Sequence, residues 1–441
     1  MISCHLCHGG AAEWRLIMID NKLFCLPEEI RNEDYIIATY YIKLDSHIDI
    51  IKKASALAIG QTIGTWVPVP GITDEMREKF MGKVVQIYDV PSIDLSTQLT
   101  ENVRNYLIQI AYPTINIPPD FPILITTLLG NDASTSAQVK LLDIEFPKKF
   151  VEQFNGPNFG IEGIRKISGV YNRPLLLNMI KPCLGLKPVE GARIFYETAL
   201  GGVDMIKDDE LLGSPSYSLA ANRVKEFKKA SEAAYEKSGK RTLYLVNVTD
   251  SSSNIMNTIS NVIEAGAEAI MVNFAAVGYN TLHQIAKKVH IPILAHCAGA
   301  GMFYEGTDSG MSSPLSVGKL TRLAGADIVM INTPYGGYPM RHQKYIQTTQ
   351  QLALPYYHIK RAMPSIGGGV HPGLVEKFIK ELGCDIVLAA GGAIQGHPMG
   401  SASGVNAMFQ AIQAALEGVM LEDAAKNSEE LSMALALWNN K

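Results

Sequence analysis

The chain has 441 residues, of which 47% are hydrophobic and 19% charged, with a formal net charge of -4 and a pI near 6.2. This composition is typical of a folded protein with one or two domains and argues against a binder of nucleic acids or anionic membranes, which needs a basic patch. No apolar run approaches the roughly 20 residues of a membrane span, and no basic start precedes an apolar segment. We therefore expect a cytoplasmic protein that acts on a small molecule and binds neither nucleic acid nor membrane.

Residues 1–33 form a predicted N-terminal extension that contains Cys4-His5-Leu6-Cys7-His8. This spacing matches the attachment motif of c-type haem, but no export signal precedes it, so a tail without a cofactor is the better interpretation. The six cysteines are scattered along the chain, unlike those of a secreted disulfide framework, and we expect reduced thiols.

Residues 34–150 mix short β-rich runs with helical stretches, which predicts a compact α+β domain of ferredoxin-like type. A helix is expected at 48–59. The expected strands are 35–42, 84–88, 121–128 and 140–145.

From 151 to 441 the pattern changes to eight apolar runs, each followed by a helical stretch. This alternation indicates an α/β fold, a (β/α)8 TIM barrel whose catalytic groups stand at the carboxyl ends of the strands. The expected strands are 175–180, 204–207, 242–247, 269–273, 293–296, 328–332, 362–366 and 386–389.

Polar residues follow most of these strands and would converge at one mouth of the barrel. After the second strand, alternation places Lys207 and Asp209 on one side and Asp208 on the other, with Glu210 at the turn. Two carboxylates beside a lysine predict a magnesium site if CO2 converts the amine to a carbamate; the alternative is a salt-bridged surface cluster. Lys181, Asn247, Asn273 and His296 stand at other strand ends.

Glycine runs follow the seventh and eighth strands, where barrels often hold phosphate. Gly367, Gly368 and Gly369 form the first run, and Gly391 and Gly392 the second. Glycine lets backbone amides approach an anion closely, so we predict a phosphate site there, although such runs also make ordinary turns.

The string Gly201-Gly202-Val203-Asp204-Met205-Ile206-Lys207-Asp208-Asp209-Glu210 resembles the signature of RuBisCO and RuBisCO-like proteins. Ile180-Lys181-Pro182, Gly64-Thr65-Trp66, Gly130-Asn131, His296 and Gly396-His397-Pro398 stand in the order of that family, over about residues 34–430. The resemblance implies a Mg2+ ion bound by carbamylated Lys207, Asp209 and Glu210, with Lys181 as acid/base and His296 on the substrate. It also implies a homodimer in which Thr65, Trp66 and Asn131 serve the neighbouring subunit's site.

The departures from the carboxylase pattern point to the RuBisCO-like, form IV branch. A lysine is replaced by Cys183, an arginine by Cys297 and a glutamate by Gly60, and residues 332–338 lack the lysine that polarises CO2. Carboxylation is therefore not expected. The donors for a second phosphate are lost near Met330 and Gly367, so we expect a phosphorylated ketone with a single phosphate.

The resemblance implies magnesium-dependent enolisation, with Lys181 or the Lys207 carbamate as base. The related 2,3-diketo-5-methylthiopentyl-1-phosphate enolases carry a base lysine where this chain has Asn131, so the match is incomplete. Isomerisation of a methylthioribulose phosphate, decarboxylation of a 3-oxo acid phosphate through the same enolate, and a non-catalytic sugar-phosphate-binding role stay open as alternatives.

Overall fold

The computed structural model describes residues 21–31, 34–65 and 69–438. Cys4, Cys7 and Trp66 lie outside the described residues. The chain forms two compact units: an N-terminal unit up to Phe154 that also includes Met302–Leu315, and a barrel unit made of Asn155–Gly301 and the chain from Ser316 on. The sequence predicted a boundary near residue 150 but gave no sign that a later segment belongs to the first unit.

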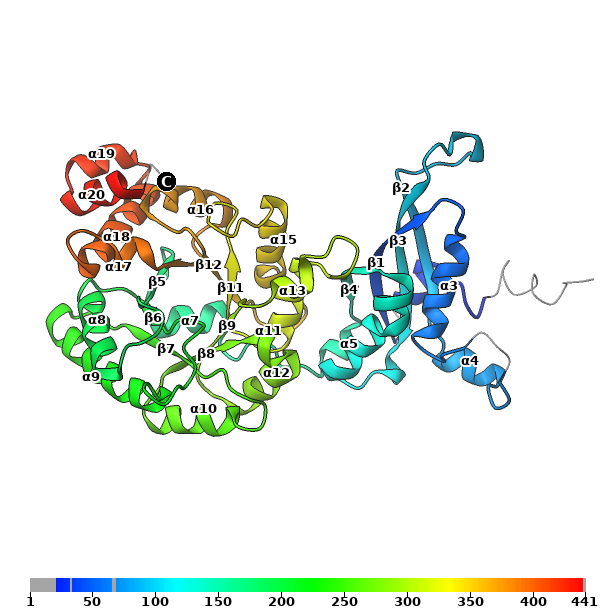
Figure 1. Cartoon of the computed structure of the whole chain (residues 1–441), viewed down its shortest axis with the longest axis horizontal. Coiled ribbons are helices and arrows are strands. Elements are labelled where there is room, and N and C mark those ends of the chain that lie inside the picture. Colours follow the sequence, from blue (N-terminus) through cyan, green and yellow to red (C-terminus); the bar gives the residue numbers. More distant parts are fainter. Residues whose placement is uncertain (1–20, 32–33, 66–68, 439–441) are drawn as a thin grey trace, which may run out of the picture. The chain divides into compact units, whose positions relative to one another are not determined.

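The N-terminal unit is a β-α-β-β-α-β fold, which confirms the predicted ferredoxin-like domain (Figure 1). Its sheet has the order β10-β4-β1-β3-β2, with β1, β2, β3 and β4 antiparallel and β10 parallel to β4. The strands are β1 Tyr35–Asp45, β2 Lys83–Val90, β3 Val103–Pro113, β4 Lys140–Glu145 and β10 Gly310–Met311, and the helices are α2 Pro27–Ile30, α3 Ile50–Gly60, α4 Asp74–Phe80, α5 Phe121–Leu129 and α6 Lys148–Val151.

Two expectations for this unit were wrong. Residues 121–128 form helix α5 and not a strand, because Asp120 caps the helix by accepting a hydrogen bond from the Ile123 amide (3.2 Å) and Pro122 stands in its first turn. Strand β3 was missed, although it pairs with β1 along the whole length of both strands.

In the barrel unit, eight described parallel strands close in the order β11-β12-β13-β5-β6-β7-β8-β9, which confirms the predicted TIM barrel. The strands are β5 Leu175–Met179, β6 Met205–Lys207, β7 Leu243–Asn247, β8 Ala269–Asn273, β9 Ile293–His296, β11 Ile328–Asn332, β12 Met363–Gly367 and β13 Val387–Ala390. The helices of this unit are α7 Gly160–Ser168, α8 Pro188–Leu200, α9 Ala220–Ser238, α10 Ile255–Glu264, α11 Phe274–Val277, α12 Tyr279–Lys288, α14 Leu320–Leu323, α15 His342–Ala353, α16 Val375–Leu382, α17 Gly392–Gln395, α18 Ser401–Glu417, α19 Leu421–Lys426 and α20 Glu429–Trp438, and most of them surround the strands in Figure 1. Helix α13 Gly301–Tyr304 belongs to the N-terminal unit from Met302 on. None of the described helices is long and apolar enough to cross a membrane.

The barrel interior is an apolar core built from alternate residues of the strands. Leu177, Met205, Leu245, Met271 and Met330 belong to this one buried cluster. Helix α7 adds Ile161 and Ile164 to the cluster and closes the end where the strands begin. The amides of Phe159 and Gly160, at the start of this helix, donate to Asp327, which directly precedes β11.

Candidate active site

The inward-facing rows of the barrel end in polar residues at the opposite mouth. Because side chains alternate along a strand, the residue two places after each inward apolar residue also faces the interior. That rule leads from Met205 to Lys207, from Leu245 to Asn247 and from Met271 to Asn273. It leads likewise to His296, Asn332 and Gly367 at the ends of β9, β11 and β12. The convergence that the sequence predicted is therefore built into the strand pattern.

Lys207, Glu210 and His296 lie together at this mouth. The Lys207 side chain is fully buried, and its Nζ lies 3.4 Å from Glu210 Oε2 and 3.0 Å from the carbonyl oxygen of Asp208. His296 Nε2 lies 3.5 Å from the same Glu210 oxygen. Because His296 Nδ1 accepts a hydrogen bond from the Ala298 amide (3.1 Å), Nε2 carries the proton of the neutral ring and faces Glu210.

Lys181 and Asp209 form a second pair. Lys181 Nζ donates to Asp209 Oδ2 at 2.8 Å and to Cys183 Sγ at 2.9 Å. The Asp209 side chain is 3% exposed, whereas that of Lys181 is 40% exposed, so the lysine stands at the open side of the pair. A ligand that enters the mouth meets Lys181 before Asp209.

Burial and neighbouring charges shift the pKa values of these groups in different directions. Burial lowers the pKa of Lys207 below its ordinary value, although Glu210 and Asp209 act to raise it. Burial also holds the pKa of His296 well below its ordinary value. Burial alone would lower the pKa of Lys181, but its bonds to Asp209 and Cys183 outweigh this and raise it well above the ordinary value.

Two asparagines hold the backbone that carries the carboxylates. Asn247 Nδ2 donates to the carbonyl oxygens of Asp209 (3.2 Å) and Glu210 (3.1 Å), and Asn273 Nδ2 donates to that of Glu210 (2.8 Å). The sequence singled out both asparagines as strand ends without giving them a task. The structure shows that they fix the turn at which Glu210 leaves the strand.

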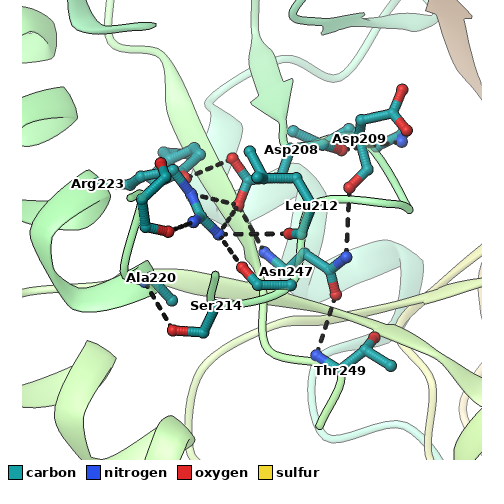
Figure 2. Close-up of polar contacts among 12 residues, drawn as sticks. Asp208, Asp209, Leu212, Ser214, Ala220, Arg223, Asn247 and Thr249 are labelled. Carbon is teal, nitrogen blue, oxygen red and sulfur yellow. Dashed lines mark hydrogen bonds and ion pairs between the residues drawn. The ribbon is translucent and has the colours of Figure 1, made fainter. Parts of the chain in front are cut away.

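Asp208 faces the other way, as alternation predicted. Its carboxylate lies against Arg223 of helix α9, with Arg223 Nη2 to Asp208 Oδ2 at 2.9 Å, while Asp209 lies away from this arginine (Figure 2). The side chains of Asp208 and Arg223 are each 1% exposed. Sequence reasoning missed Arg223, because it lies 15 positions after Asp208 and nothing in the sequence between them shows which helix residue meets the outward carboxylate.

The glycine runs flank the same mouth. A side chain at Gly391 would contact Met179 and Lys181, which places this glycine beside the candidate base. Gly368 and Gly369 adopt positive φ values of 87° and 83°, a backbone conformation that favours glycine. A side chain at Gly336, in the loop after β11, would overlap the carbonyl of Gly368, so the two loops pack backbone against backbone.

The positions expected to bind a second phosphate are occupied by apolar atoms. A side chain at Gly367 would collide with the sulfur of Met330, whose own side chain is 3% exposed. Cys297 Sγ lies 3.8 Å from Asn332 Oδ1, and burial raises the pKa of the Cys297 thiol to about 12. This side of the mouth therefore offers no charged donor among these residues.

Thr65 and Asn131 belong to the N-terminal unit, and Asn131 directly precedes the turn 132–137. The glutamate that the resemblance places at position 60 is absent, and the carboxylate of Asp132 fills the space that a side chain at Gly60 would need. The glutamate missing at position 60 is thus accompanied by a different carboxylate, that of Asp132, close to the same place.

The donor set at the barrel mouth fits a hard divalent cation only with a modified lysine. No three His, Cys, Asp or Glu side chains come together as a metal site in the part of the chain that the structure describes. Asp209 and Glu210 supply carboxylate oxygens, and Lys207 lies 3.4 Å from one of them. A carbamate on Lys207 would add the oxygen donors that an amine lacks.

Comparison with known proteins decides the family. The model of the ribulose bisphosphate carboxylase large chain, catalytic domain, matches residues 160–438, and that of its N-terminal domain matches residues 26–150. The chain belongs to the RuBisCO large-chain family. Within this family it is a RuBisCO-like protein of the form IV type, and its fold is the RuBisCO fold.

The similar proteins include RuBisCO-like proteins and enolases. A ribulose bisphosphate carboxylase-like protein of Archaeoglobus fulgidus is 44% identical over 92% of both chains. A 2,3-diketo-5-methylthiopentyl-1-phosphate enolase of Bacillus cytotoxicus is 36% identical over 92% of this chain and 98% of its own length. A crystal structure of a RuBisCO-like protein from Alicyclobacillus acidocaldarius superposes with a TM-score of 0.85 at 35% identity, covering 92% of this chain and 100% of that one.

Proposed function

We propose that this RuBisCO-like protein is a magnesium-dependent enzyme that enolises a ketone carrying one phosphate, without fixing CO2. The observation that carries the proposal is the meeting of Lys207, Asp209 and Glu210 with Lys181 and His296 at one barrel mouth. The similarity to enolases that act on a phosphorylated diketone supports the reaction class. The missing donors around Met330 and Gly367 support a single phosphate.

In the proposed site, Lys207 as a carbamate, Asp209 and Glu210 hold Mg2+. The bound ion would act as a Lewis acid on the substrate's carbonyl and hydroxyl oxygens and stabilise the negative charge of the enolate. Asn247 and Asn273 keep the carbonyls of Asp209 and Glu210 in place, so that the two carboxylates stay oriented toward the mouth.

Lys181 is the proposed base that removes the proton from the carbon beside the ketone. Because its bond to Asp209 helps to raise its pKa, we propose that it serves as a base only after the cation has taken up the Asp209 carboxylate. Its side chain stands at the open side of the site, and its Cε lies near Gly391, where the phosphate is expected. Neutral His296, with its Nε2 proton toward the site, would donate a hydrogen bond to a substrate oxygen. The amides around Gly368, Gly369, Gly391 and Gly392 would bind the phosphate.

Deuterium exchange tests this function. Phosphorylated ketoses and oxo acids are incubated with the protein in D2O, with and without Mg2+ and bicarbonate, and loss of the α-proton signal is followed by NMR. We expect exchange only with both additions and only with substrates that carry one phosphate. Release of CO2 from an oxo acid phosphate would assign decarboxylation instead. No exchange, together with no thermal stabilisation by Mg2+ and bicarbonate, would favour the non-catalytic alternative.

We also propose that two copies share their sites, with Asn131 and Thr65 of one copy completing the barrel mouth of the other. Leu184, Leu211, Tyr217 and Leu219, in the loops that follow β5 and β6, are exposed apolar side chains of the kind that a partner covers. Complementation tests this. Inactive Lys181→Met and Asn131→Ala proteins, unfolded and refolded together, should regain about a quarter of the activity if sites are shared, because half of the random dimers then hold one intact site. Absence of any recovery would refute sharing.

A further inference from the structure

The loop between β6 and α9 carries both proposed carboxylate ligands, and one arginine holds this loop at several points. Arg223, in the first turn of α9, donates from Nε (3.2 Å) and Nη2 (2.9 Å) to Asp208 Oδ2. The same guanidinium donates to the carbonyl oxygens of Gly213 (2.7 Å) and Ser218. Only a planar fork with several fixed donors satisfies all of these acceptors at once.

Asp208 is fixed from three further directions. Tyr244 donates its hydroxyl to Asp208 Oδ1 at 2.6 Å, and the amide of Asn247 donates to Asp208 Oδ2 at 2.9 Å. The Asp208 amide in turn donates to the carbonyl of Leu245 at 3.2 Å. The Asp208 carboxylate is 1% exposed and accepts from three residues, of which Figure 2 labels Arg223 and Asn247. These bonds hold the backbone at 208 in its orientation.

This orientation decides where the neighbouring side chains point. Lys207 and Asp209 are the residues on either side of Asp208, and alternation sends both to the face opposite Arg223. A rotation of the backbone at 208 would turn the Lys207 amine and the Asp209 carboxylate away from each other. The buried ion pair therefore sets the geometry of the mouth from the outer side of the barrel wall.

We propose that Arg223 and Tyr244 are positioning residues for the divalent-cation site: by holding Asp208 they keep Lys207 and Asp209 at the spacing that cation binding needs. This inference rests on the proposed function. Residues that orient metal ligands typically change metal affinity ~10–100-fold when they are replaced. Both residues would act through Asp208, and neither is proposed as a ligand of the cation.

The test measures Mn2+ affinity in bicarbonate by electron paramagnetic resonance, because bound Mn2+ loses the signal of the free ion. Arg223→Lys keeps the charge but not the fork. Tyr244→Phe removes the hydrogen bond from the tyrosine hydroxyl to Asp208 but keeps the ring, whose centroid lies 4.8 Å from that of the Phe227 ring. The matched control is Arg173→Lys, because Arg173 forms a similar pair with Asp204 (2.7 Å) at the opposite end of the same strand.

We expect Arg223→Lys to weaken Mn2+ binding ~10–100-fold and Tyr244→Phe to weaken it by a smaller factor. Arg173→Lys should lower the melting temperature and leave the affinity unchanged. Equal affinities in the wild type and both site variants, or an equal loss in Arg173→Lys, would overturn the inference. If Arg223→Lys does not fold, Tyr244→Phe decides. Failure of the wild type to bind Mn2+ would instead overturn the proposed function.

Discussion

Lys181 Nζ and Asp209 Oδ2 lie 2.8 Å apart, although the lysine follows β5 and the aspartate follows β6. The pair joins the proposed base to a proposed metal ligand. A cation that takes up the Asp209 carboxylate therefore competes with Lys181 for the same oxygen. In the proposed mechanism, binding of the metal would therefore also release Lys181 from Asp209.

Replacing Lys181 with methionine should separate the proton transfer from metal binding. We expect α-proton exchange to fall ~10²–10⁴-fold, the range of a lost general base, while Mg2+ with bicarbonate still raises the melting temperature. The control is Lys187→Met, which removes an exposed lysine at the start of α8. Exchange at the wild-type rate in Lys181→Met would remove this lysine from the mechanism.

Two adjacent glycines allow a matched test of the phosphate site. A methyl group on Gly391 would point toward Met179 and Lys181, whereas one on Gly392 would meet Trp438 at an ordinary contact distance of 3.5 Å. We expect Gly391→Ala to weaken binding of inorganic phosphate about tenfold or more, because its methyl group would crowd the side of the loop that faces Lys181. Gly392→Ala should bind normally, because alanine keeps the backbone amide and its methyl group points toward Trp438 instead. Calorimetric titration measures both. Equal affinities would place the phosphate elsewhere.

Restoring the glutamate that RuBisCO-type sites carry near position 60 would bring a second carboxylate against Asp132. In Gly60→Glu the new side chain would overlap the Asp132 carboxylate, and we expect a loss of ~1–3 kcal/mol in the free energy of unfolding. Asp132→Gly in the same chain should recover most of it. Gly337→Glu is the control, because no atom lies within 4 Å of the site of its side chain. The free energy of unfolding is measured for each variant by denaturant unfolding monitored by circular dichroism. Unchanged stability in Gly60→Glu would contradict the expected overlap with Asp132.

Stability should fall in mild acid because of His283 in helix α12. Burial, and next Lys287, lower the pKa of this 3% exposed histidine below 6.5. Below about pH 6.5, His283 is therefore protonated in the unfolded chain while it stays neutral in the folded chain. The stability that neutral His283 contributes to the fold is complete above pH 6.5 and is lost as the pH falls toward its folded-state pKa. In that range the free energy of unfolding changes by at most about 1.4 kcal/mol per pH unit.

His283→Gln should flatten this dependence between pH 7.5 and 5.5, measured by urea unfolding, whereas His47→Gln, which removes an exposed histidine, should not. Parallel curves for the wild type and His283→Gln would show that another group is responsible.

The barrel could be predicted from the sequence because its strands are buried on both faces and read as continuous apolar runs. Each observed strand end lies within one residue of its expected place, as for β8 Ala269–Asn273. The location of the site followed for the same reason, since strand ends of a parallel barrel share one mouth. The roles assigned to its residues stay predictions.

What the sequence could not reveal depends on contacts between distant segments. The run at 121–128 is a separate case: it is apolar apart from Thr126 and Thr127, so periodicity does not distinguish a helix from a strand, and the neighbouring cap at Asp120 was the signal to weigh. The pairing of Gly310 with Lys140 joins residues far apart in the chain. Alternation placed Asp208 outside the barrel, but only the packing of α9 brings Arg223 to it.

The close contact of Gly336 with the backbone of Gly368 limits what evolution or design can do with this scaffold. A lysine placed at Gly336, in the loop after β11, would push against the glycine run proposed to hold the phosphate. The two loops must therefore be exchanged together, because changing either one alone would damage a partner that has not yet adapted. A path of single substitutions that places the lysine at this glycine would pass through that damaged intermediate.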